Sequence, residues 1–257
     1  MVPSSVRCTL ATDEPPPVAV HNRSGCSRIL LIGDHAGRAI PRALGDLGLG
    51  AEELRRHIAW DIGVRALGES LAGALDATFI HQIYSRLVID CNRLPGTSQS
   101  VAEISDGTVV PGNRGLDAGA IDARVAGLHA PYHAAIADEL GRRRARGERT
   151  ILVSLHSFTP VMGGHARPWE VGLLHDRGDT SFTAAVLRGL LARQDLCVGD
   201  NEPYKMDGTD YTVPRHAYPA SIPYAEFEVR QDLIATAQGV DHWTRILAEV
   251  IAAASAE

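Results

Sequence analysis

Short apolar runs that end in glycine or polar residues alternate with segments of helical periodicity along most of this chain. The runs are too short for helices and are typical of buried strands; they occupy residues 28–32, 78–83, 87–89, 150–155, 171–174 and 222–229. Helical segments lie between and after them, at residues 61–75, 117–146, 181–193 and 240–254, and residues 40–49 are expected to form a short helix or a turn. Because strands that alternate with helices usually form a sheet covered on both faces, we predict an α/β fold with a largely parallel sheet.

The size and composition fit one globular domain. The chain has 257 residues, of which 45% are hydrophobic and 22% are charged, and this composition excludes a mostly disordered or collagen-like protein. Residues 1–27 contain Pro15-Pro16-Pro17 and show no periodicity. They are therefore predicted to form a flexible N-terminal tail ahead of a single domain over residues 28–257.

The charge balance and the cysteines limit the partners and the compartment. The net charge of −6 and the aromatic content of 5% argue against nucleic acid as a partner. No apolar run is long enough to span a membrane, and the N-terminus does not resemble a secretory signal. The four cysteines form no CxxC pair, so we expect reduced thiols in a cytoplasmic protein. The sequence makes no prediction of the oligomeric state.

Polar residues that follow the predicted strands are the candidates for chemistry, because ligands of open α/β sheets bind beyond the carboxyl ends of strands. His35 follows the first strand and His156 the fourth, while Arg86 and Asp90 follow others. The last strand carries Glu226, Glu228 and Arg230 in alternation, so these three side chains share one face.

This set of residue types suits zinc. A single histidine at a strand end is more often structural than a ligand, but two histidines with several acids and arginines are costly to bury without a metal or substrate. Zinc accepts imidazole nitrogen and carboxylate oxygen, and its catalytic sites use three protein ligands. A free carboxylate nearby can act as a general base, and an arginine can bind a substrate carboxylate through two hydrogen bonds.

Several longer stretches resemble the N-formylglutamate amidohydrolase family. They are spread from about residue 28 to the C-terminus and read His57-Ile-Ala-Trp-Asp-Ile-Gly63, Tyr84-Ser-Arg-Leu-Val-Ile-Asp-Cys-Asn-Arg93, Leu155-His-Ser-Phe158, Asn201-Glu-Pro-Tyr204, Tyr211-Thr-Val-Pro-Arg-His216 and Phe227-Glu-Val-Arg-Gln-Asp-Leu-Ile234. The resemblance implies a three-layer α/β sandwich with a mostly parallel or mixed central sheet, related in architecture to zinc carboxypeptidases and aspartoacylase. It also implies a zinc-dependent hydrolase that releases formate from N-formyl-L-glutamate in histidine breakdown.

The carboxypeptidase pattern can be carried over at four positions. His35 matches the first metal histidine, and His156-Ser157-Phe158 matches the second histidine motif. Asn92-Arg93 matches the pair that holds the substrate carboxylate, and Glu228 matches the catalytic glutamate.

The third metal ligand departs from that pattern. Carboxypeptidases place a glutamate three residues after the first histidine, where this chain has Arg38. Asp61 is the first candidate to replace it and Asp34 the second. Arg86 is the candidate donor to the oxyanion of the transition state.

Other interpretations stay open at this level. Asp61 could begin a helix, Arg86 and Asp90 could form a structural ion pair, and Glu226 could be a solvated edge residue. His216 and Arg230 are candidates for further substrate contacts, although His216 could instead cap a loop.

The substrate and the function itself also have alternatives. The enzyme could act on a different N-acyl amino acid or on a C-terminal peptide bond, with the segments 95–115 and 159–170 shaping the pocket. Because Arg38 stands where carboxypeptidases have a glutamate ligand, the chain could instead be a metal-free, non-catalytic binding module. A divalent ion other than zinc could also occupy the site.

Overall fold

The protein is built around one mixed seven-stranded sheet. The structure, a computed structural model, describes residues 10–257. The strands lie in the spatial order β1 (Val18–His21), β3 (Thr78–Gln82), β2 (Ile29–Gly33), β6 (Ile151–Phe158), β11 (Tyr224–Arg230), β9 (Val171–Leu174) and β10 (Val198–Asp200). The four consecutive strands from β3 to β11 are parallel, β1 and β9 each run antiparallel to their inner neighbours, and β10 is parallel to β9. The predicted α/β fold is confirmed, with a mixed sheet.

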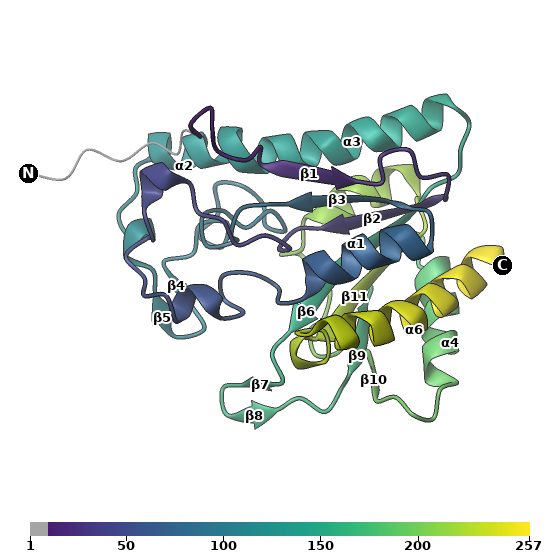
Figure 1. Ribbon diagram of the computed structural model, residues 1–257. Helices are drawn as coiled ribbons and strands as arrows, with labels where there is room; N and C mark the ends of the chain where they lie inside the picture. The colour runs from purple at the N-terminus through teal and green to yellow at the C-terminus, as the bar shows by residue number, and fades with distance from the viewer. Residues whose placement is uncertain (1–9) are drawn as a thin grey trace, which may run out of the picture.

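Helices cover both faces of this sheet, as Figure 1 shows. On one face lie α1 (Val64–Ala74), α4 (Ser181–Leu191) and α6 (Ala237–Ala256); on the other lie α3 (Ala130–Ala145) and α5 (Thr212–His216). Within β2, Leu31 packs in the first of these cores, whereas Leu30 and Ile32 pack in the second. This alternation on a fully buried strand explains why its sequence is continuously apolar.

A separate apolar cluster supports the loops beside the carboxyl ends of the central strands. It includes Tyr84, Val88 and Leu128. The buried guanidinium of Arg124, from α2 (Ala118–Arg124), donates hydrogen bonds to the backbone oxygen of Val88 and to Asn113 Oδ1. Two small hairpins emerge from these loops and from the end of β6: β4 (Ile104–Ser105) with β5 (Thr108–Val109), and β7 (Val161–Met162) with β8 (His165–Ala166).

Three sequence-based predictions about the elements need correction. The expected tail over residues 1–27 is wrong for residues 18–21, which form the edge strand β1; the first nine residues lie outside the described part of the chain. Residues 87–89 form buried turns rather than a strand, because they pack into the loop cluster. The single helix expected over residues 117–146 consists of α2 and α3, which a π-helical segment, Val125–His129, joins.

Within residues 10–257, no helix has both the length and the apolar character needed to cross a membrane.

Candidate metal centre and active site

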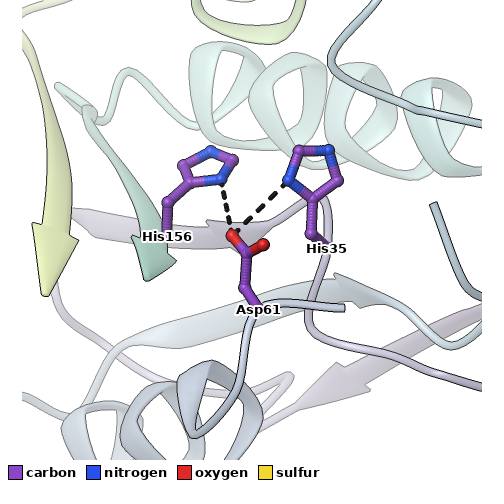
Figure 2. Close-up of side chains that lie close together, drawn as sticks. All are labelled: His35, Asp61 and His156. Atoms are coloured by element: carbon purple, nitrogen blue, oxygen red, sulfur yellow. Dashed lines mark hydrogen bonds and ion pairs between the residues drawn. The ribbon is translucent and has the colours of Figure 1, made fainter. Parts of the chain in front are cut away.

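Three side chains from separate segments converge at the carboxyl ends of β2 and β6. His35 follows β2, His156 lies near the end of β6, and Asp61 precedes α1. Their ligand atoms all lie within 4.8 Å of one another, and all three residues are buried. Asp61 Oδ2 lies 3.0 Å from His156 Nδ1 and 3.5 Å from His35 Nδ1 (Figure 2). Two imidazole nitrogens and a carboxylate oxygen thus face a common point.

The backbone holds Asp61 in this position. Its N–H donates to the carbonyl oxygen of His35 at 2.9 Å, which joins the two segments directly. Two residues later, Gly63 has a φ of +86°. A Cβ at that position would lie 2.3 Å from the carbonyl oxygen of Ile234. Glycine is therefore required for the turn that carries the chain from Asp61 into α1.

A second carboxylate supports each histidine from behind. His35 Nε2 lies 2.7 Å from Asp90 Oδ1, and His156 Nε2 lies 3.3 Å from Asp34 Oδ2. Because a carboxylate accepts hydrogen bonds, the contact with Asp90 places the ring proton of a neutral His35 on Nε2 and leaves its Nδ1 lone pair facing Asp61. His156 Nε2 also lies 3.1 Å from Ser154 Oγ. Acidic partners that orient the ligand histidines in this way are typical of zinc sites.

The electrostatics of the cluster favour a cation. Burial disfavours charged imidazoles, but the nearby carboxylates outweigh burial and raise the pKa values of His35 and His156. Burial likewise opposes ionisation of Asp34, but the hydrogen bond from His156 and nearby positive charge lower the pKa of Asp34 to about 2. The site therefore stabilises positive charge placed among these residues.

The residues present fit a metal ion. His35 Nδ1 is buried and makes no hydrogen bond, which is costly for a polar atom unless a ligand satisfies it. The set of two nitrogens and one oxygen is one that zinc uses in catalytic sites, where three protein ligands leave a position open.

Arg38 does not take part in this cluster, although it occupies the position where carboxypeptidases have a glutamate. Its guanidinium stacks over the ring of Trp60, 5.2 Å from the ring centroid. Asp61, from a different segment, brings the carboxylate to the site instead. Asp34 contacts His156 on the opposite ring nitrogen, so the geometry favours Asp61 over Asp34 as the third ligand.

Arg86 contacts both Asp61 of the cluster and Asp90, the carboxylate behind His35. Its Nε and Nη2 donate to Asp90 Oδ2 at 3.1 and 2.7 Å, and its Nη1 lies 3.4 Å from Asp61 Oδ1. The structural ion pair considered from sequence is therefore present. Arg86 nevertheless also lines the cavity described next, so the pair does not exclude a contact with substrate.

A cavity of about 560 Å³ opens over this cluster, and Glu228 lines it. Glu228 on β11 is the register partner of His156 on β6. It is buried, and its Oε2 has no hydrogen-bond partner. Burial raises the pKa of Glu228 to about 7. A carboxyl group with such a pKa, facing a cavity beside a candidate metal ligand, is suited to accept and return a proton near neutral pH.

Glu226 precedes Glu228 by two residues on β11 and therefore lies on the same face of the sheet. Its register partner on β6 is Ser154. It also lines the cavity, and only 2% of its surface is exposed. The view of Glu226 as a solvated edge residue is therefore wrong, because β11 is an inner strand of the sheet. Burial raises the pKa of Glu226 to about 8.

Asn92 and Arg93 both line the cavity, but each already has partners within the protein. Asn92 Oδ1 accepts the backbone N–H groups of Tyr211 and Thr212, at 3.0 and 2.9 Å. The Nη1 of Arg93 donates to Asp210 Oδ1 at 3.2 Å. Asn92 thus holds the 211–212 segment in place, and an anionic substrate would compete with Asp210 for Arg93.

His216 and Arg230 are placed elsewhere. His216 Nε2 lies 3.0 Å from Nδ1 of the buried His133, and His216 lines a different cavity, beside α3. Arg230 pairs with Asp232 at 2.8 Å. Neither is among the described residues that line the cavity over the candidate metal centre. Their expected contact with substrate is therefore not supported, because each contacts a partner outside this cavity.

Sequence reasoning missed several residues that line the cavity. They are Tyr204, Lys205, Asp207 and Asp210 from one loop and His57 from another. Tyr204 ends the family-like stretch 201–204 and His57 begins the stretch 57–63, so the sequence carries a signal for both loops. The segments 95–115 and 159–170 both reach the cavity, through Ser105 and Asp106 and through Met162.

The chain is similar to known proteins over most of its length. The family model described as N-formylglutamate amidohydrolase matches residues 27–235. The crystal structure of gene product Atu2144 from Agrobacterium tumefaciens is similar at 35% identity, covering 96% of this chain and 98% of that one, with a TM-score of 0.93. N-formylglutamate amidohydrolase from Ralstonia eutropha JMP134 shares the fold at 19% identity, with coverage of 94% and 98% and a TM-score of 0.69. None of the curated proteins compared with this chain matches it. The chain therefore belongs to the N-formylglutamate amidohydrolase family, a family of amide-bond hydrolases.

Proposed function

We propose that this protein is a zinc-dependent amidohydrolase that cleaves the amide bond of a small N-acyl amino acid, with N-formyl-L-glutamate as the best candidate substrate. The observation that carries this proposal is the convergence of His35, Asp61 and His156 beneath a cavity that Glu228 also lines. Membership of the family supports the reaction class, and the donor set supports the metal.

In this proposal His35, Asp61 and His156 hold the zinc ion. When bound there, zinc supplies Lewis acidity, which favours attack by water and stabilises negative charge on the carbonyl oxygen. Asp90 and Asp34 fix the ring orientations of the two histidines through their Nε2 atoms.

The chain's own residues perform the proton transfers. Glu228 accepts a proton as a water molecule adds to the acyl carbon, and it returns that proton to the nitrogen as the C–N bond breaks. The products are then formate and the free amino acid. Arg86, on the cavity wall, is placed to donate to the developing oxyanion, and Arg93 is the candidate partner of the substrate's α-carboxylate.

The direct test is hydrolysis by purified protein loaded with one equivalent of zinc. We expect release of free amine from N-formyl-L-glutamate, loss of this activity on chelation and its return when zinc is added back. A panel of N-acetyl and N-formyl amino acids and short peptides identifies the acyl group. If only another member of the panel is hydrolysed, that compound replaces N-formyl-L-glutamate as the proposed substrate. Protein that binds no zinc and hydrolyses nothing would overturn the proposal in favour of a binding module.

A cytoplasmic location is also part of this proposal. Cys26, Cys91 and Cys197 all carry free thiols, which supports a reducing, cytoplasmic compartment.

A further inference from the structure

Lys205 is the single lysine among the 25 basic residues of this chain, and it lies on the wall of the catalytic cavity. The residues on both sides of it are anchored. The hydroxyl of Tyr204 accepts a hydrogen bond from Arg167 at 2.9 Å, and the Arg167 guanidinium stacks on the Tyr204 ring. Met206 is buried in the core beneath α5. The backbone therefore holds Lys205 at the cavity while its own side chain is exposed.

The other two cations on this wall are already paired. Arg86 contacts Asp90 and Asp61, and Arg93 contacts Asp210. For Lys205, by contrast, no ion pair or hydrogen bond of its ammonium group is found within residues 10–257. It is thus the cation on this wall that can meet an incoming anion without first breaking an internal pair.

The acids around the cavity do not cancel this charge. Asp210 is paired with Arg93, and Asp106 is paired with Arg56. Asp207, two residues from Lys205, uses its Oδ1 to accept the backbone N–H of Thr209. It remains the acid that would repel an anion at this part of the wall.

We propose that Lys205 selects substrates that carry a second anionic group, by pairing with a carboxylate on the side chain of an N-acyl amino acid. This inference rests on the proposed function for the reaction and its acidic substrate, and it adds the residue that recognises the second carboxylate. A cavity of about 560 Å³ can hold a molecule with two carboxylates at its ends. Lys205 acts here on specificity and takes no part in bond breaking.

The first test compares two substrates of nearly equal shape, N-formyl-L-glutamate and N-formyl-L-glutamine. We expect the ratio of their kcat/KM values, acidic over neutral, to fall about 10- to 100-fold in Lys205→Met, because one charge-assisted contact is lost. Lys205→Arg should keep most of the preference, and Asp207→Asn should increase it. Arg188→Met, which removes a positive charge from the surface of α4, is the matched control and should leave the ratio unchanged.

The second test needs no turnover. Because Lys205 is the only lysine, reductive methylation followed by mass spectrometry reports on this one side chain and, separately, on the α-amino group. We expect glutarate to protect Lys205 in wild-type protein and glutaramide to give no protection.

The outcomes separate the two proposals. Protection by glutarate without hydrolysis of any N-acyl amino acid would refute the proposed function and support the role of Lys205. Hydrolysis with an unchanged substrate ratio in Lys205→Met, together with no protection by glutarate, would overturn the role of Lys205. If Lys205→Met fails to fold, Lys205→Arg and the protection experiment still decide the question.

Discussion

Glu228 and His156 lie directly opposite each other on the parallel strands β11 and β6. The candidate base and a candidate metal ligand are therefore fixed by one register of the sheet, and a shift of that register by one residue would turn Glu228 to the opposite face. The inner position of both strands makes such a shift costly.

Glu228→Gln should keep the metal and lose turnover. The amide cannot accept the proton of the attacking water, so we expect kcat to fall by about 10²- to 10⁴-fold. The checks are steady-state kinetics and metal content by elemental analysis. Glu226→Gln is the matched control, since it changes the neighbouring carboxyl on the same face, and its effect should be much smaller. Retained turnover in Glu228→Gln would remove Glu228 from the mechanism.

Asp61→Asn and Asp34→Asn distinguish a metal ligand from a supporting residue. Loss of a supporting carboxylate typically weakens metal affinity by about 10- to 100-fold, and we expect this of Asp34→Asn. Asp61→Asn should weaken zinc binding further, because it removes an anionic ligand. Competition with a chromophoric chelator measures both affinities. Equal affinities, or a weaker one in Asp34→Asn, would transfer the ligand role to Asp34.

Arg93→Ala should raise KM for N-formyl-L-glutamate about 10- to 100-fold, because a charge-assisted contact with the α-carboxylate is lost. The kcat should change less, since Arg93 lies on the cavity wall and pairs with Asp210. Initial-rate kinetics on one acidic and one neutral N-formyl amino acid measure this. Both substrates carry the α-carboxylate, so both should be affected. An unchanged KM would rule out this role for Arg93.

The His133–His216 pair should make stability fall in acid. Burial lowers the pKa of His133 to about 3 and that of His216 to about 4, from 6.5. His133 Nε2 donates to the carbonyl of Cys91, so its Nδ1 accepts the proton of His216 Nε2, and protonation would place two N–H groups against each other. The unfolded chain takes up protons below pH 6.5 and the folded protein does not. Stability is therefore complete above pH 6.5 and decreases as the pH falls toward 4.

Urea unfolding of the zinc-loaded protein between pH 7 and pH 4 checks this expectation. From the two pKa shifts, the pair should account for on the order of 6 kcal/mol of the loss in unfolding free energy. The double variant His133→Gln/His216→Gln should be less stable at pH 7 but should show a shallower pH dependence. A slope equal to that of the wild type would contradict the assignment.

Much of the fold could be predicted from local patterns. The continuous apolar runs before Gly33 and around Leu152 indicated inner strands, because only a strand buried on both faces needs apolar residues at every position. The edge strand β1 gave no such signal. Its residues Val18–His21 are partly exposed, and their strand conformation depends on pairing with β3, which lies about sixty residues further along the chain.

The sequence by itself determined the inner strands, the residue types of the site and the family to which the chain belongs. Only the tertiary structure decided that Asp61 faces both histidines while Asp34 lies behind one of them, that Glu226 is buried, and that His216 contacts His133 instead of the cavity. The physical reason is that periodicity depends on neighbours in the chain, whereas these roles depend on which groups from distant segments share one buried volume. There, burial and the nearest charges set both partners and pKa values.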